Sequence, residues 1–393
     1  MRLSQPSATA VHSVVGRYRI PFNRPFLTSA ARSRLAESIS SSVWSGDGPF
    51  TRRVRQLLEE ELDVPAALLT TSGTSALEMM ALLIDVATGD EVIVPSYTFA
   101  STANAFILRG VRPVFIDARV DTLNLDERLL PELITLRTRA IVTMHYAGVA
   151  CEMDAIHGIV ADRSITVLED NAHGLFGQYR GRPLGTLGAL AALSFHETKN
   201  FPCGEGGCLL VNDEQLLDRA EILREKGTDR SRFWRGEVNQ YTWRDIGSSY
   251  LLADPLAAIL LGQLEERELI QQTRMRAWKR YMQELRPWAV THGVTLPTVP
   301  PHCEHPAHLF YLCLPDASTR SRLIAHLASQ GILAVSHYVP LNTSPFGRRL
   351  GGRPGQCPVS EDISKRLVRL PLYNDISDDD IDSVLETVTT CPL

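Results

Sequence analysis

The sequence has no apolar run that approaches the ~20 residues of a membrane-spanning helix, so we expect no membrane partner. Residues 1–19 also lack a clean apolar core, because His12 interrupts the one candidate stretch, and a secretory signal is not expected. Charges of one sign form no long run, and 40 basic against 45 acidic residues give a net charge of −5. This balance indicates no surface for nucleic acid or acidic lipid.

Cysteine is sparse, with seven scattered residues and no Cys-x-x-Cys pair. Cys203 and Cys208 are separated by four residues, and no second pair of thiols or histidines stands at zinc spacing. No metal site is therefore predicted. We interpret the cysteines as reduced thiols of a cytoplasmic protein.

Short, nearly all-apolar runs alternate with helical patterns in the first half of the chain. The runs predicted to be strands are 91–95, 113–117, 140–145, 165–170, 191–195 and 208–211. Several helical patterns lie between them, including 75–86 and 154–162. The alternation predicts an α/β fold whose mostly parallel central sheet is flanked by helices.

The flanking segments predict a second, smaller unit. Helices are expected at 30–42 and 50–62, and one continuous helix from Ala253 to about Leu285 is expected to bridge to a C-terminal α+β domain. In that domain the predicted strands are 309–314 and 332–337, and the predicted helix is 318–329. We divide the chain into an N-terminal extension at 1–19, a large domain at 20–255, and a bridging helix with a small domain at 256–393.

Lys199 is the most informative residue, because it follows an apolar strand on a loop while Asp170 closes the strand before it. A pyridoxal phosphate enzyme requires this layout. The lysine amine forms a Schiff base with the cofactor aldehyde, and the carboxylate pairs with the protonated pyridine nitrogen. For Lys199 alone, a solvated surface lysine is the commoner case.

A phosphate site is predicted next to this pair. Gly73 permits a tight turn at an expected helix start, where the amides of Thr74 and Ser75 would face an anion. Ser194, at the end of the strand before Lys199, offers a further hydroxyl. By themselves these residues would more often form an ordinary helix cap.

Two further groups are expected around the cofactor ring. Either Phe99 or Tyr97 could stack on the pyridine, and we favour Phe99. In a helical first turn, His173 would lie on the same face as Asp170 and could reach the phenolic oxygen of the cofactor.

Several sequence blocks together resemble the DegT/DnrJ/EryC1/StrS sugar aminotransferase family, a fold-type I pyridoxal phosphate group. They are residues 21–25, 45–53, 95–99, 145–149, 194–200, 224–228 and 241–249. The last three are most similar to the subgroup called dTDP-4-amino-4,6-dideoxygalactose transaminase. The likeness runs from about residue 19 to the C-terminus, and no single motif carries it.

The resemblance implies roles for the residues named above. Lys199 would be the Schiff-base lysine, Asp170 the pyridinium partner and His173 the neighbour of the phenolic oxygen. The phosphate would be held by Thr74, Ser75 and Ser194, with Phe99 stacked on the ring. The cofactor would be pyridoxal 5′-phosphate, which carries the nitrogen as pyridoxamine 5′-phosphate between the two half-reactions.

The resemblance also implies a homodimer in which a loop of the second chain completes the phosphate site. Here that loop is 241–244, with Thr242 where many relatives have asparagine. A segment near the sugar often ends in histidine in relatives, whereas this chain has Asn342. For His308, His337 and Tyr338 a place in the sugar pocket is expected, with a purely structural role as the alternative for the histidines.

The expected reaction is transfer of an amino group from L-glutamate to C4 of a dTDP-4-keto-6-deoxyhexose. A 3-aminotransferase acting on a 3-ketosugar nucleotide stays open, because regiochemistry depends on how the sugar lies in the pocket. A dehydratase on the same fold would carry histidine in place of Lys199. A pyridoxal-phosphate-binding regulator would need a basic helix-turn-helix domain, for which the ~19 residues before the fold are too few.

Overall fold

A seven-stranded sheet forms the centre of the computed structural model, which describes residues 18–393. Residues 1–17, most of the expected N-terminal extension, lie outside the described residues. The strand order is β1-β9-β8-β5-β4-β2-β3, and only β9 runs antiparallel to its neighbours. The strands are β1 (Ala66–Thr70), β2 (Glu91–Pro95), β3 (Arg112–Ile116), β4 (Thr138–Met144), β5 (Thr166–Asp170), β8 (Leu190–Ser194) and β9 (Gly207–Val211). The predicted α/β class with a mostly parallel sheet is confirmed.

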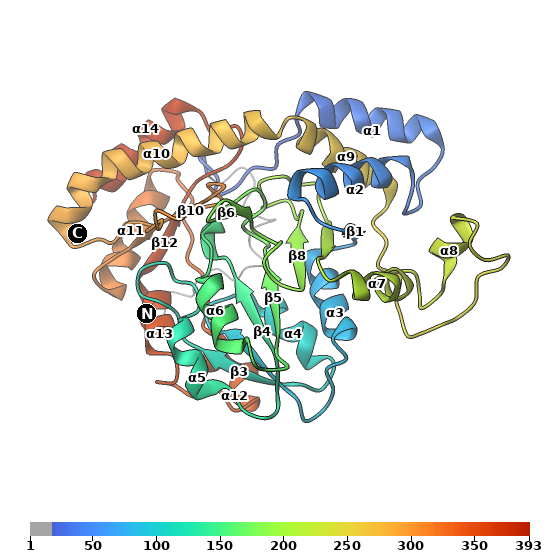
Figure 1. The fold of residues 1–393 in the computed structure, drawn as a ribbon. Coiled ribbons are helices and arrows are strands. Elements are labelled where there is room, and N and C mark those ends of the chain that lie inside the picture. Colours follow the sequence, from blue (N-terminus) through green and yellow to red (C-terminus); the bar gives the residue numbers. More distant parts are fainter. Residues whose placement is uncertain (1–17) are drawn as a thin grey trace.

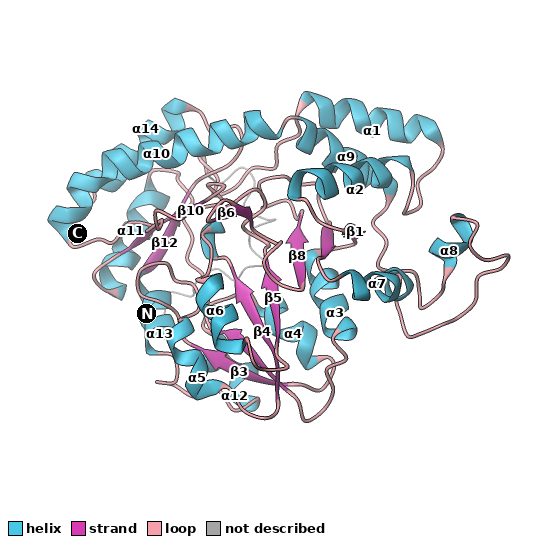
Figure 2. Ribbon diagram, viewed as in Figure 1, coloured by secondary structure: helices cyan, strands magenta, loops and turns pink. Residues whose placement is uncertain are grey.

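Helices lie on both sides of this sheet, as Figure 2 shows. Successive strand residues point to opposite faces. Leu168 therefore packs in the core beneath α3, α4 and α7, whereas Val167 packs with α5 and α6. On the second face α2 and α9 cover the β1, β8 and β9 end. The helices of this region are α1 (Ser29–Ser41), α2 (Pro49–Leu62), α3 (Gly73–Leu83), α4 (Ala100–Ile107), α5 (Leu130–Leu133), α6 (Met153–Val160), α7 (Leu217–Arg224) and α8 (Arg230–Trp234).

The C-terminal elements build another apolar core. There α10, α11 and α14 pack with a two-stranded antiparallel sheet, and Ile20 of the N-terminal arm joins the same core. The elements are α9 (Asp254–Glu265), α10 (Arg267–His292), α11 (Ala317–Ser329), α12 (Pro345–Arg349), α13 (Pro358–Arg366), α14 (Asp378–Thr389), β11 (Phe310–Cys313) and β12 (Leu367–Leu370). A small sheet joins β10 (Cys303–Glu304), β6 (Gln178–Tyr179) and β7 (Arg182–Pro183). The division at 20–255 and 256–393 stays a prediction.

The bridging helix predicted from Ala253 to about Leu285 is two helices, with Glu266 between α9 and α10. The Glu266 carboxylate accepts hydrogen bonds from Ser29 Oγ (3.0 Å) and from the Ala30 N–H (3.2 Å). These bonds hold Glu266 at the first turn of α1, where its acid also complements the positive helix end. The interruption between α9 and α10 thus coincides with a contact between segments more than 200 positions apart. The hydrophobic periodicity of the helix itself does not contain this information.

The strand predicted at 332–337 is wrong. In this segment Ile332 and Val335 make only isolated bridges, to Ile20 and Arg369 respectively. The partner of β11 is instead β12, a four-residue segment that contains Arg369, directly follows Lys365 and Arg366, and was not predicted as a strand. Within residues 18–393, no helix combines the length and the apolar character that crossing a membrane requires.

Candidate active site

The predicted site residues gather at the carboxyl ends of the parallel strands, where open α/β sheets place their ligands. Asp170 ends β5, Ser194 ends β8, and Tyr97 and Phe99 follow β2. One pocket opens between these strand ends. It is lined by Asn171, Ala172, His173, Leu175, Ser194, Lys199, Asn200, Phe201 and His308.

Lys199 stands on the loop between the antiparallel strands β8 and β9. The loop is closed at its base by the pairing of Ser194 with Gly207, and the Lys199 N–H donates to the His196 carbonyl (2.9 Å). Burial lowers the pKa of the Lys199 amine to about 8, although Asp170 opposes this and Arg369 adds to it. A lowered pKa supplies more neutral, nucleophilic amine near neutral pH.

Asp170 points toward α4, on the opposite face of the sheet from Glu169. Its carboxylate accepts hydrogen bonds from Thr102 Oγ1 (2.7 Å) and from the Ala172 N–H (3.2 Å). Burial nevertheless raises the pKa of Asp170, against the effects of these hydrogen bonds and of the Lys199 charge. A cation beside the carboxylate would offset the unfavourable burial of its charge.

His173 and His308 lie stacked beside Lys199, with ring centroids 4.1 Å apart. The Nδ1 atom of His173 is buried and has no hydrogen-bond partner. His308 Nδ1 pairs with Asn200 Oδ1 (2.9 Å), while Asn200 Nδ2 donates to the Pro306 carbonyl (2.7 Å). Burial is the main reason why the pKa values of both rings lie well below the ordinary value. Both imidazoles are therefore neutral at pH 7.

The expected phosphate residues meet at the start of α3. Ser72 caps the helix by accepting a hydrogen bond from the Ser75 N–H (3.0 Å). A Cβ atom added at Gly73 would lie 3.0 Å from Ser194 Cβ, so glycine lets the helix start approach the end of β8. The Thr74 hydroxyl pairs with Ser101 Oγ (2.8 Å) at the start of α4. This corner combines backbone N–H groups, hydroxyls and a positive helix end, as an anion site requires.

The two aromatic candidates differ in how they are used. Tyr97 is buried, and its hydroxyl donates to the carbonyl of His337. Phe99 is 60% exposed at the start of α4, with its ring centroid 6.3 Å from that of Tyr338. An open ring is available for stacking, which favours Phe99 over Tyr97.

His337 and Tyr338 form a wall above this region, with their rings stacked at 4.0 Å. His337 Nε2 also pairs with the Tyr146 hydroxyl (2.7 Å), so this imidazole nitrogen already has a partner within the chain. Tyr338 lies 5.7 Å from the Tyr97 ring, and burial raises the pKa of its phenol to about 12. Both side chains lie near the pocket without being among its lining residues.

Two residues considered from the sequence do not reach the pocket. Asn342 is fully buried and is held by Ser96 Oγ (2.6 Å) and Glu361 Oε1 (2.7 Å), which gives it a packing role. The segment around α8 projects from the body of the molecule (Figure 1), and Thr242 follows α8 in the sequence. Its N–H donates to Asp229 Oδ1 (2.6 Å), and within a single chain it does not line the pocket.

Sequence reasoning missed Thr102 and Asn200, which orient Asp170 and His308. Thr102 lies on α4, a helix that the sequence did not predict because its threonine and serine content is unusual for a helix interior. Asn200 directly follows Lys199, and its proximity to the lysine was the only available signal.

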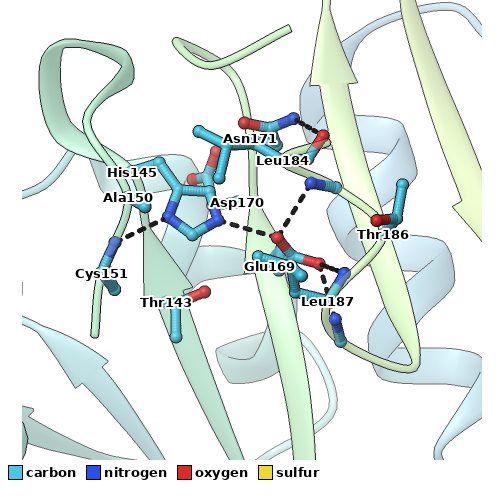
Figure 3. A network of polar contacts seen from close by, with 12 residues as sticks. Thr143, His145, Ala150, Cys151, Glu169, Asp170, Asn171, Leu184, Thr186 and Leu187 are labelled. Carbon is cyan, nitrogen blue, oxygen red and sulfur yellow. Dashed lines mark hydrogen bonds and ion pairs between the residues drawn. The ribbon is translucent and has the colours of Figure 1, made fainter. Parts of the chain in front are cut away.

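A second buried carboxylate lies behind Asp170 on the other face of the sheet (Figure 3). Glu169 accepts four hydrogen bonds, from His145 Nε2 (2.8 Å) and the N–H groups of Gly185 (2.9 Å), Leu187 (2.7 Å) and Gly188 (2.6 Å). His145 Nδ1 accepts from the Cys151 N–H (3.1 Å), so the ring proton resides on Nε2. Burial acts to raise the pKa of Glu169, but the hydrogen bonds from His145 and the loop outweigh it and leave the pKa lowered.

Replacing Glu169 with glutamine is expected to destabilise the fold by about 3–5 kcal/mol, because an amide group would face N–H donors in a fully buried site. The measurement is the free energy of unfolding from urea titration. The matched control is Glu152→Gln, since Glu152 also pairs with a histidine, His302 (3.1 Å), but near the surface. That change should cost less than about 1 kcal/mol. Equal losses for the two variants would contradict a special role for the buried pair.

Comparison with known proteins agrees with this geometry. The profile of the DegT/DnrJ/EryC1/StrS aminotransferase family matches residues 27–389. This chain belongs to that family. It is 32% identical over 380 residues to MJ1066 of Methanocaldococcus jannaschii, covering 94% of this chain and 97% of that protein. It is 31% identical over 377 residues to the spore coat polysaccharide biosynthesis protein SpsC of Bacillus subtilis, with 94% and 96% covered.

A solved sugar aminotransferase has the same fold. The structure of Spr1654 from Streptococcus pneumoniae, described as a putative sugar aminotransferase, matches with a TM-score of 0.88 at 26% identity. The match covers 95% of this chain and 98% of that chain. Spr1654 has also been solved in its PLP and PMP forms. The present chain, as a member of this family, is accordingly a PLP-dependent sugar aminotransferase.

The residues present fit the cofactor. Asp170 offers a buried carboxylate for a cationic ring nitrogen, and the unpaired Nδ1 of His173 offers a polar contact inside the pocket. Ser194 and the first turn of α3 offer hydroxyls and N–H groups for a phosphate. Lys199 offers an amine with a lowered pKa. These groups come from different elements: Lys199, His173 and Ser194 line the pocket, Asp170 bonds to the Ala172 N–H in its wall, and the start of α3 lies beside Ser194.

Proposed function

We propose that this aminotransferase transfers the amino group of L-glutamate to C4 of dTDP-4-dehydro-6-deoxy-D-glucose, giving a dTDP-4-amino-4,6-dideoxyhexose. The observation that carries the chemistry is the convergence of Lys199 and His173 on one pocket beside Ser194, with the Asp170 carboxylate bonded to the N–H of Ala172 in the pocket wall. The choice of a C4 keto sugar is supported by the resemblance of residues 194–200, 224–228 and 241–249 to the 4-aminotransferase subgroup.

One of these blocks is part of the rigid framework. Arg224 in residues 224–228 is buried, and its guanidinium binds both Asp47 carboxylate oxygens (2.7 Å each). This bond ties the block to the turn before α2, which is itself part of the resemblance. The relationship to SpsC, whose name places it in polysaccharide synthesis, supports a sugar destined for a cell-surface polymer.

In the proposed mechanism Lys199 Nζ is the general base. When bound, PLP supplies the electron sink that makes a proton on the α-carbon of the donor labile. Lys199 Nζ would take that proton from the α-carbon and pass it to the C4′ carbon of the cofactor, and its lowered pKa suits both steps. Asp170, held in place by the hydrogen bond from Thr102, would supply the negative charge that pairs with the ring nitrogen. The neutral His173 contributes a hydrogen bond without adding charge.

The test is incubation of the holoenzyme with L-glutamate and dTDP-4-keto-6-deoxyglucose. We expect 2-oxoglutarate and an aminated nucleotide sugar in equal amounts, and proton coupling constants will identify C4 and its axial or equatorial amine. If the enzyme does not aminate this sugar but does aminate a 3-ketosugar nucleotide, the protein is a 3-aminotransferase and the proposal is wrong. The Lys199→Ala protein is the control for uncatalysed exchange.

We further propose a cytoplasmic homodimer, in which residues 241–244 of one chain complete the phosphate site of its partner. Residues 241–244 are held by contacts within their own chain, because the Asp229 carboxylate accepts hydrogen bonds from the Thr242 N–H and from Arg244 Nε (2.6 Å each). Trp243 of this segment is nevertheless 81% exposed, and Trp234 at the end of the neighbouring α8 is 70% exposed. Braced segments that present aromatic rings to solvent are typical of protein interfaces. Cysteines that are all unpaired favour a reducing compartment.

The dimer proposal predicts complementation between two inactive proteins. One carries Lys199→Ala, and the other has residues 241–244 replaced by glycine and serine. In a mixed dimer, the intact residues 241–244 of the first chain complete the site that contains the intact Lys199 of the second chain. Random re-association of equal amounts should then restore about a quarter of the wild-type activity, because half of the dimers have one complete site of two. Activity that stays at zero, with dimers present by sedimentation, would contradict a shared site.

A further inference from the structure

Arg369 lies on β12 and faces the active-site wall. In the β11–β12 pair it stands directly opposite Tyr311, so the two side chains share one face of the small sheet. The Tyr311 ring is 5.7 Å from that of Tyr146, which lies 6.2 Å from the ring of His173. Arg369 therefore belongs to the small C-terminal sheet but points toward the pocket that holds Lys199.

The guanidinium of Arg369 has no carboxylate partner among residues 18–393. Its Nε atom is buried without an acceptor, and its central carbon lies 4.4 Å above the ring of Phe22 from the N-terminal arm. Arg274 shows how the same fold satisfies a structural arginine. That guanidinium is buried and donates to four acceptors, on Ala307 (3.0 Å), Asn374 (2.8 Å), His308 (2.6 Å) and Leu372 (3.4 Å).

The charges around the pocket leave room for one more anion. Lys199, Arg369 and Arg274 are the basic side chains whose charges act on the pocket histidines, and Asp170 is the acid that acts on Lys199. Arg369 lowers the pKa of the His173 and His337 rings in addition to the larger effect of burial, so its charge is felt at the reacting centre. The cofactor phosphate is accounted for by Ser194 and the start of α3. A carboxylate beside Arg369 would balance the remaining positive charge.

We propose that Arg369, held against the ring of Phe22, binds the α-carboxylate of the amino donor. This inference rests on the proposed use of L-glutamate. A guanidinium fork matches a carboxylate with two parallel hydrogen bonds, and so it fixes orientation as well as charge. The nucleotide sugar has no carboxylate at its reacting carbon, because its negative charges lie on the diphosphate. Arg369 thus acts in the half-reaction of the amino acid and not in that of the sugar.

The test compares Arg369→Met and Arg369→Lys with the wild-type holoenzyme. The first half-reaction is followed in single turnovers, by the change in cofactor absorbance at increasing L-glutamate. Loss of a bidentate, charge-assisted contact should weaken the apparent glutamate affinity about 10- to 100-fold in Arg369→Met, and less in Arg369→Lys, which keeps the charge. The reverse half-reaction, with the aminated nucleotide sugar as donor, should change by less than about 3-fold.

A second readout does not depend on turnover. Glutarate has two carboxylates and no amine, so its binding to the resting holoenzyme, measured by calorimetry, should weaken in Arg369→Met by the same factor as glutamate. The matched control is Arg349→Met, because Arg349 also stacks on an aromatic ring, that of Phe346 (4.9 Å), but on the exposed α12. It should bind both ligands like the wild type.

Unchanged glutamate and glutarate affinities in Arg369→Met would overturn the inference. A loss of nucleotide-sugar affinity as large as that for glutamate would overturn it too, by assigning Arg369 to the diphosphate. Failure of the proposed function has a different signature. In that case the wild-type protein would not aminate the dTDP sugar, while glutarate binding would still decide the role of Arg369.

Discussion

Replacing Lys199 with alanine is expected to lower turnover by about 10⁴-fold, because one amine serves both as covalent anchor and as general base. The purified wild-type protein should be yellow, and the variant should lose that colour on desalting. No other lysine lines the pocket, so no side chain is placed to take over either role.

The matched control is Lys365→Ala on the exposed face of α13, which should keep full colour and activity. Borohydride treatment of the wild type, followed by peptide mapping, should find the modified lysine at position 199. A modified peptide elsewhere, or wild-type turnover by the alanine variant, would remove the basis of the proposed site.

Asp170→Asn is expected to lower kcat by about 10²- to 10³-fold while much of the cofactor affinity remains. The amide keeps the size of the side chain but removes the negative charge that would hold the ring nitrogen protonated. Steady-state kinetics and the cofactor content after gel filtration separate the two effects.

The hydrogen bond from Thr102 provides a graded comparison. Thr102→Val keeps the Asp170 charge but removes a donor at 2.7 Å, and it should cost only about 10-fold in kcat. Asp154→Asn, on the surface of α6, should have no effect. If Asp170→Asn turned over at the wild-type rate, Asp170 would not be the partner of the ring nitrogen.

Much of the central sheet could be predicted from sequence because its buried strands are short, continuous apolar runs. β2 matches the prediction at both ends, and β5 and β9 match it within one residue. β1 escaped prediction because Ala66, Ala67, Leu68 and Leu69 are good helix formers, and only pairing with β9 makes them extended. β12 escaped it because its apolar run is only Leu367-Val368, which stands between Arg366 and Arg369.

The candidate site divides in the same way. That Lys199, Asp170 and His173 lie near one another could be predicted, because such residue types after buried strands suggest a shared site; their catalytic roles stay predictions. Arg369 and Asn200 were not, because their significance depends on neighbours far along the chain, such as Tyr311 and His308. The role of Thr242 stays a prediction, since it concerns a second chain.

The antiparallel direction of β9 has a consequence for cofactor uptake. Because Ser194 and Gly207 are paired, the two ends of the twelve-residue loop that carries Lys199 are held together. A Cβ atom added at Gly207 would lie 2.2 Å from the carbonyl carbon of Ser72, so this hairpin packs directly against the predicted phosphate site at the start of α3. The β8–β9 hairpin and the start of α3 are thus in their binding positions without a cofactor. Cofactor binding then costs little conformational entropy of the protein, so most of the free energy of the contacts contributes to affinity.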